Sequence, residues 1–453
     1  MKRSTSRQRP SARPRLEWLE GRLQPSAGAG AGWQIAAVAP AVHALQAEQG
    51  PTPVLLGGPG GAPPPGGVNS ATYVTGTTGS STGRGVAVDA AGNEYVTGTL
   101  VATNGNTFAF VTKYDTSGNQ VYLYGLYFSA DGAIDPTEGH GIAVDSSGNL
   151  YVVGTFQQLN GITWSYVVKT SNDFTMFLGT ALFGRTAGLN SLDGVALDQA
   201  GHVIATGVSS PNGGAAEVFY ADLNASNFSV VGAHAYDFSG LGFQASFGAG
   251  VGVQPDGSHL AIAGTLVPFS GSLNELLLRV TNPATGEATM AAVSSADGDA
   301  VGTAAAVDAA GDDFFAGTVA VPGGTVADVQ KFAPGSDLTA PPVWEYQSAD
   351  TTSTVNALAL GTGGTIYITG SAQDAGGNPR VLITQLLDTG DDVQEAGTAQ
   401  VGGTGPSDVG MAVAVDLAGN AVVAGTTTSP DFPVTDGSTL NGSSDAFLLN
   451  YGF

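Results

Sequence analysis

The 453-residue sequence contains no cysteine, so neither disulfides nor thiolate ligands contribute to its stability or its chemistry. No run reaches the roughly 18 apolar residues that a membrane-spanning helix needs, and we therefore expect no transmembrane segment. No stretch shows sustained helical periodicity, which argues against a fold of alternating strands and helices. These absences leave an all-β protein as the favoured class.

Basic residues are also scarce, and they are unevenly placed. Of the 14 Lys and Arg, seven lie within the first 22 residues, and the other seven face 36 of the 38 Asp and Glu. A body this acidic repels phosphate backbones, so we expect no nucleic-acid partner. Cations are the more plausible small ligands.

The N-terminal part divides by composition. Residues 1–47 begin with a basic stretch, and residues 48–67 form a Gly- and Pro-rich linker that ends in GGPGGAPPPGG. We expect residues 1–47 to be disordered. On these features alone, a secretory signal and a basic tail without a targeting role both stay open.

A short motif favours export. RPRLEWLEGRLQPS, Arg13 to Ser26, resembles the N-terminal LE-x-LE-x-R-x-x-PS segment of many large exported bacterial surface proteins. The resemblance implies a secreted or cell-surface protein of a bacterium.

From Val68 onward the chain is built from copies of GVAVDAAGNEYVTGT, Gly85 to Thr99. The position of the turn aspartate recurs seven times at steps of 53 to 56 residues, namely at Asp89, Asp145, Asp198, Gln254, Asp308, Gly361 and Asp416. Such a period indicates a propeller or a solenoid. Where Gln254 and Gly361 replace the aspartate, Asp256-Gly257 and Gly363-Gly364 are expected to form the turn.

Each period holds four strands, which in the first copy are expected at 85–88, 94–100, 108–114 and 120–128. The third strands align as FVTKY, YVVKT, VFYAD, LLLRV, DVQKF, LITQL and FLLNY. Their fourth column contains Lys113, Lys169, Ala221, Arg279, Lys331, Gln385 and Asn450. We interpret this column as structural, with basic side chains meeting acids or lying over apolar faces. A functional ring of cations is the alternative.

The two ends favour a closed ring over a solenoid. The seventh copy stops after its third strand, and an unpaired strand, Ala71–Thr77, precedes the first copy. Pairing the two would remove an open edge and complete the last blade. The motif AVD-x-x-GN-x-YV-x-GT at Ala87–Thr99, its copy at Ala414–Thr435 and DAFLLNY at Asp445–Tyr451 resemble the SBBP family of bacterial seven-bladed β-propeller repeats. We therefore predict a single seven-bladed propeller of four-stranded antiparallel blades over residues 68–453.

Function is expected in the longer loops, which lead from the outer strand of one blade to the inner strand of the next and from the second strand to the third. Loops held by a rigid scaffold commonly bind ligands. The candidate ligand-binding residues are Asp131, Asp135, Glu138, His140, Asp297 and Asp299. The sequence offers no catalytic residues and no metal-ligand set. The turn aspartates are spread around the ring, so calcium has no convergent set of oxygens there.

The leading hypothesis is a monomeric, non-catalytic scaffold or binding module for protein or glycan ligands, with no cofactor. One alternative is a carbohydrate-active lyase or hydrolase, in which Glu138 and His140 would perform acid–base chemistry. A second alternative is a structural surface protein stabilised by calcium.

Overall fold

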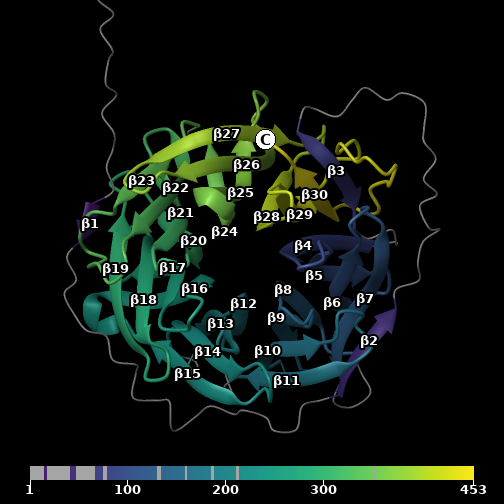
Figure 1. The fold of residues 1–453 in the computed structure, drawn as a ribbon, viewed down its shortest axis with the longest axis horizontal. Coiled ribbons are helices and arrows are strands. Elements are labelled where there is room, and N and C mark those ends of the chain that lie inside the picture. Colours follow the sequence, from purple (N-terminus) through teal and green to yellow (C-terminus); the bar gives the residue numbers. More distant parts are fainter. Residues whose placement is uncertain are drawn as a thin grey trace, which may run out of the picture.

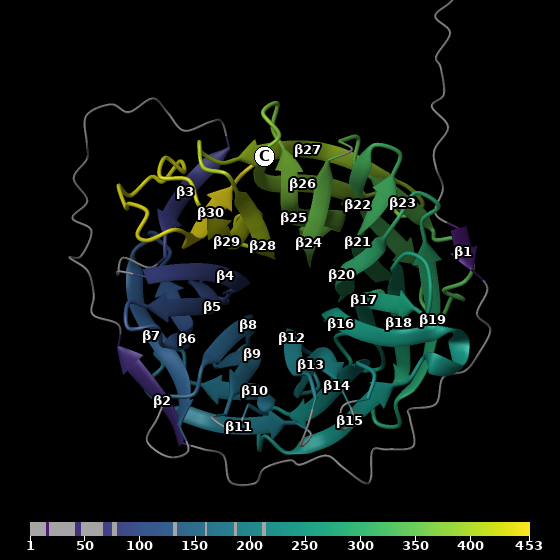
Figure 2. The ribbon, with the colours of Figure 1, turned by 180° about the vertical axis from the view of Figure 1, so that it is seen from behind.

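The computed structural model describes residues 15–17, 41–46, 67–74, 79–129, 134–158, 161–184, 188–210, 214–350 and 352–453. Seven antiparallel sheets stand around a central axis like the blades of a propeller (Figure 1). Figure 2 shows the same ring from behind, with the innermost strand of every blade facing the axis. The predicted fold class and blade number are confirmed.

Each blade runs from an inner to an outer strand. Blades 1 to 4 consist of β4 (Gly79–Val88), β5 (Glu94–Ala102), β6 (Thr107–Tyr114) and β7 (Gln120–Ser129); β8 (Thr137–Val144), β9 (Leu150–Gln157), β10 (Thr163–Thr170) and β11 (Phe177–Phe183); β12 (Asn190–Leu197), β13 (His202–Ser209), β14 (Glu217–Asn224) and β15 (Val230–Tyr236); and β16 (Phe243–Val253), β17 (Leu260–Pro268), β18 (Asn274–Asn282) and β19 (Glu287–Ser294). Blades 5 to 7 consist of β20 (Ala300–Val307), β21 (Asp313–Val321), β22 (Gly324–Phe332) and β23 (Trp344–Gln347); β24 (Ser353–Leu360), β25 (Thr365–Gln373), β26 (Pro379–Asp388) and β27 (Val393–Val401); and β28 (Asp408–Val415), β29 (Ala421–Thr427), β30 (Asp445–Tyr451) and β3 (Val68–Tyr73).

The ring closes as predicted, because β3 is the outer strand of the last blade. It pairs antiparallel with β30, with Tyr73 opposite Phe447. The strand lies slightly earlier than the predicted Ala71–Thr77, and residues 75–78 fall outside the described residues. Tyr73 is buried, and its hydroxyl donates to the carbonyl of Ser429 at 2.6 Å. The first and last parts of the propeller are thereby held in one sheet.

Two short stretches of the N-terminal segment also pair with the ring. β1 (Arg15–Glu17) lies along β19, and β2 (Ala41–Gln46) lies along β7. Both are fifth strands at outer blade edges, where Figure 1 shows them in purple. At these two places the structure has strands where the sequence predicts disorder; the rest of residues 1–47 and linker residues 48–66 lie outside the described residues. In the described residues, no helix is long and apolar enough to cross a membrane.

The turn between the first two strands of a blade has the expected mechanism. In blade 1, Oδ1 of Asp89 accepts the backbone N–H groups of Ala91 and Asn93 at 2.9 and 2.8 Å. Its Oδ2 accepts the Asn93 amide at 2.7 Å and the Tyr95 hydroxyl at 2.9 Å. The replaced turns also form, since Gly257 and Gly363 have φ of 75° and 68°. The turn is a structural device, because its carboxylate is occupied by the repeat itself.

The basic column of the third strands has the predicted structural role. Lys113 and Lys169 lie over the rings of Tyr95 and Tyr151, at 5.3 and 5.2 Å from the ring centroids. Arg279 Nε pairs with Asp313 Oδ2 of the next blade at 2.5 Å.

The member assigned to blade 3 was wrong by one residue. Asp222 pairs with Ile204, as Lys113 pairs with Tyr95, so Asp222 and not Ala221 belongs to the column. Strands Glu217–Asn224 and Thr107–Tyr114 are buried on both faces. Their apolar pattern therefore does not fix the register in which the two strands align.

Candidate functional site in the central channel

Every inner strand contains a β-bulge at the same position of the repeat. At this position the ladder to the second strand skips one residue in every blade, and these seven residues form what we call the bulge ring: Arg84, His140, Asp193, Ala249, Thr303, Asn356 and Met411. A bulge re-aims the side chain of its extra residue, and bulges are common beside functional sites. Here all seven members line the channel on the propeller axis.

The channel encloses a cavity of about 190 Å³. Apart from the bulge ring, its walls are backbone and small or β-branched side chains of the inner strands, including Gly85, Gly141 and Gly194. Pockets for drug-sized molecules usually measure about 300–1,000 Å³, so this cavity suits a smaller group.

Neutral members of the bulge ring connect neighbouring blades. Thr303 Oγ1 donates to the carbonyl of Val355 at 2.9 Å, and Asn356 Nδ2 donates to the carbonyl of Gly410 at 2.8 Å. In each case the acceptor directly precedes the bulge residue of the next blade. These two side chains therefore have a structural role, which is to link adjacent blades.

The charged members lie together on blades 1 to 3. His140 Nδ1 is 2.8 Å from Asp193 Oδ1 and 3.1 Å from the carbonyl of Leu192. On its other side, His140 Nε2 is 3.4 Å from Glu138 Oε2. The His140 side chain is only 10% exposed, whereas the Glu138 and Asp193 side chains are 47% and 36% exposed. The imidazole is thus held between two carboxylates that reach the solvent.

This arrangement favours a protonated His140. Burial opposes the charged ring, but the hydrogen bonds to Asp193 and Glu138 outweigh it and raise the pKa of His140 to about 9. The hydrogen bond from His140 lowers the pKa of Glu138, and the nearby charge of Arg84 lowers it further. At neutral pH the site therefore contains an imidazolium, a guanidinium and two carboxylates.

Arg84 differs from the other charged groups of the channel. It is exposed, and among the described residues it forms neither an ion pair nor a side-chain hydrogen bond. Its guanidinium is available to a ligand that enters the channel.

The predicted site residues do not all converge. Glu138 and His140 are in contact at 3.4 Å, and His140 lines the channel. Asp135 is buried beside β7, where its N–H donates to the carbonyl of Phe128 at 2.9 Å. Asp297 and Asp299 precede blade 5, away from blade 2, and Oδ1 of Asp299 accepts the N–H of Leu273 at 2.8 Å. Asp131 lies outside the described residues.

Sequence reasoning missed Arg84 and Asp193 as members of the site. The signal was present, because each stands directly before the glycine of a GVAVD-type copy, as His140 does. The sequence alone does not show that this position lines the channel, because only the bulge turns it toward the axis.

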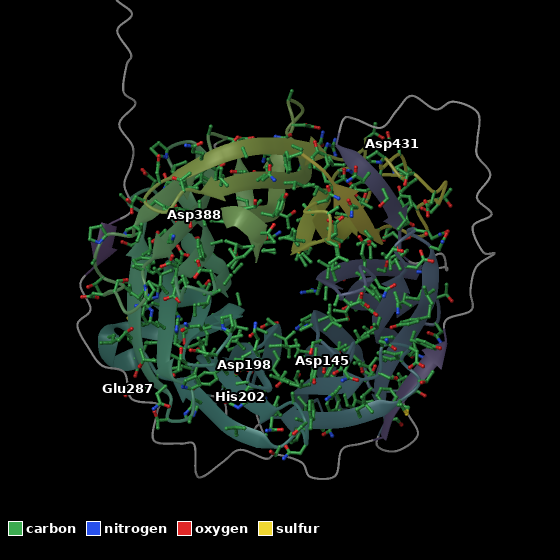
Figure 3. The ribbon with its side chains drawn as sticks, in the orientation of Figure 1. Asp145, Asp198, His202, Glu287, Asp388 and Asp431 are labelled. Atoms are coloured by element: carbon green, nitrogen blue, oxygen red, sulfur yellow. The ribbon has the colours of Figure 1, made fainter. Side chains whose placement is uncertain are left out.

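A second cavity, of about 410 Å³, lies between blades 2 and 3 on the face of the short turns. Asp145, Asp198 and His202 line it, and they lie near one another in Figure 3. His202 Nδ1 is 3.6 Å from Asp198 Oδ2 and 3.4 Å from Asp222 Oδ1. Burial raises the pKa of Asp222.

In the described parts of the chain, no three His, Asp or Glu side chains are arranged to hold a metal ion.

Comparisons with known proteins support the fold. The family model of the SBBP β-propeller repeat matches residues 123–155, from β7 to β9. No curated protein matches the chain. Among solved structures, the RRP9 WD40 repeats are similar with 9% identity and a TM-score of 0.51, over 86% of this chain and 100% of that chain. The polysaccharide lyase Uly1 is similar with 10% identity and a TM-score of 0.50, over 85% and 99%. At these identities the likeness concerns the fold alone.

Proposed function

We propose that the protein is a non-catalytic binding module, secreted or on the bacterial cell surface, that presents its long-loop face and channel to a protein or glycan ligand. The observation that carries the proposal is the state of His140. It is the histidine of the predicted acid–base pair, and a general base must be unprotonated near the working pH. With a pKa of about 9 and a carboxylate on each side, His140 instead holds its proton and fixes its neighbours.

The scaffold around it fits binding better than turnover. The strands beneath the loops form a closed ring with buried inter-blade contacts, so the ligand-facing groups are held in place before binding. Arg84 and Asp193 line the cavity, and the exposed carboxylate of Glu138 adjoins it through its contact with His140, so donors and acceptors lie close together. Such a set recognises polar ligands without a chemical step.

A carbohydrate-active lyase or hydrolase is the second candidate. It is favoured by one observation, that Arg84 and His140 line the same channel and Glu138 contacts His140 at 3.4 Å. In this alternative a neutral His140 would accept a proton. The two carboxylates beside His140 raise its pKa and so disfavour this proton acceptance, which makes the general-base reading the weaker one.

The experiment is a paired screen of the full-length protein. A glycan array and a pulldown from the cell envelope test binding, and release of reducing or unsaturated ends from polysaccharides tests turnover. We expect a ligand without turnover, and we expect cell fractionation to place the protein outside the cytoplasm. Turnover that is lost in Glu138→Gln and His140→Gln would establish the enzyme instead. Equal thermal midpoints with calcium and with chelator would remove the calcium-stabilised alternative.

A further inference from the structure

Arg84 is exceptional among the basic side chains that the structure describes in the propeller. Lys113 and Lys169 cover tyrosine rings, and the remaining described cations form ion pairs: Arg279 with Asp313, Lys331 with Asp388 at 2.7 Å, and Arg380 with Asp408 at 3.0 Å. In a chain with a net charge of −24, acids that would pair with Arg84 are abundant, yet among the described residues none does. A bulge instead turns Arg84 into the channel.

Acceptors stand on the two neighbouring blades: Asp193 lines the cavity, and Glu138 adjoins it through its contact with His140. Oε2 of Glu138 and Oδ1 of Asp193 are engaged with His140, and Ser191 Oγ also donates to Oδ1 of Asp193 at 2.7 Å. The second oxygen of each carboxylate has no hydrogen bond within the described residues. The site therefore combines one unpaired guanidinium with two acceptor oxygens that His140 holds in place.

We propose that the channel binds an acidic sugar residue, whose carboxylate pairs with Arg84 and whose hydroxyls donate to Glu138 and Asp193. The inference rests on the proposed binding function and names its ligand class. A guanidinium pairs with a carboxylate through two parallel hydrogen bonds, which fixes orientation as well as affinity. The carboxylates of Glu138 and Asp193 accept only, so they match hydroxyl groups and repel a second acid.

The size of the cavity restricts the ligand further. A volume of about 190 Å³ admits one small polar residue, and the walls opposite the charged members are lined by Ala249, Thr303 and Asn356. Thr303 and Asn356 are engaged with the next blades, so they do not compete for the ligand. The channel is therefore suited to a single terminal residue and not to the middle of a polymer.

The test is calorimetric titration of the full-length protein with glucuronate, glucose and acetate at low salt. We expect glucuronate to bind most tightly, and we expect added salt to weaken it. Arg84→Gln should weaken glucuronate binding about tenfold or more, since hydrogen bonds to charged groups are worth about 1.5–3 kcal/mol. Glu138→Gln should reduce the preference for glucuronate over acetate.

Met411→Leu is the matched control, because it changes an uncharged member of the same ring; it should bind glucuronate as the wild type does. Equal binding of glucuronate and glucose would overturn the proposal, as would unchanged affinity in Arg84→Gln when its thermal midpoint is also unchanged. Equal binding of glucuronate and acetate would overturn the sugar assignment. A neutral glycan or a protein captured equally by wild type and Arg84→Gln would leave the binding function standing while this inference fails.

Discussion

Ser81 and Asp445 join the two ends of the propeller. Oγ of Ser81, in the first inner strand, donates to Oδ1 of Asp445 at 2.5 Å, although 364 residues separate them. The same Oγ accepts the N–H of Ala446 at 2.8 Å, and both side chains are buried. The contact exists only in the closed ring, so it reports on closure.

Replacing Ser81 by Ala should destabilise the ring by about 1–3 kcal/mol, because a buried carboxylate oxygen and a backbone N–H each lose a partner. Urea unfolding followed by tyrosine and tryptophan fluorescence measures the change. Ser117→Ala, in an exposed turn, is the control and should stay within about 0.5 kcal/mol of wild type. If both substitutions lower the free energy of unfolding equally, the Ser81–Asp445 contact has no special role in closing the ring.

Truncation tests the closing strand directly. A chain that begins at residue 67 keeps β3 and should retain a cooperative thermal transition. A chain that begins at residue 75 loses β3, exposes the outer edge of β30 and uncovers the core residues that Tyr73 and Ala71 contact. We expect it to unfold at a clearly lower temperature and to associate in size-exclusion chromatography. Identical melting of the two chains would mean that β3 does not close the ring.

The sequence was sufficient for the architecture because the repeat itself carries the turn chemistry. Asp89 and its copies predict the hairpins, and the missing fourth strand of the last copy predicts β3. Register was harder to predict where a strand is buried on both faces. In β14, Val218 and Phe219 are both buried, so a shift of one residue preserved the apolar pattern and placed Ala221 where Asp222 belongs.

The site was only half predictable for a different reason. Glu138 and His140 are two residues apart, so local spacing predicts their contact. Arg84 and Asp193 are each more than 50 residues from His140 along the chain, and only the ring brings them to it. Asp297 and Asp299 were grouped with them because the acidic composition of a loop does not show which other loops lie close to it in the ring.

Two buried acids between blades 4 and 5 predict a pH dependence. Glu275 and Asp328 occupy strand positions where blade 1 has Ala109 and Phe110, and Glu345 adds a further negative charge. Burial raises the pKa of Glu275 to about 8 and that of Asp328 well above its usual range.

The unfolded chain releases these protons near pH 4–4.5, whereas the folded chain retains them. Stability should therefore fall as the pH rises from about 4.5 toward 8, by about 1.4 kcal/mol per unit for each group. Thermal midpoints measured across this range check the slope. Glu275→Gln should flatten it, and an unchanged slope in that variant would show that Glu275 does not bind the proton.

His140 should contribute a slope of the same sign at higher pH. Its folded pKa, about 9, lies above the unfolded value near 6.5, so its stabilising effect is complete below pH 6.5 and is lost as the pH rises through about 9. Titration of the imidazole Cε1–H signal by NMR measures the midpoint, and the His140→Gln variant identifies which signal belongs to His140. Asp193→Asn should lower the midpoint, because it removes the closest negative charge. A wild-type midpoint near 6.5 would leave most of His140 neutral at physiological pH and able to accept a proton, and this result would favour the enzyme alternative over the non-catalytic channel.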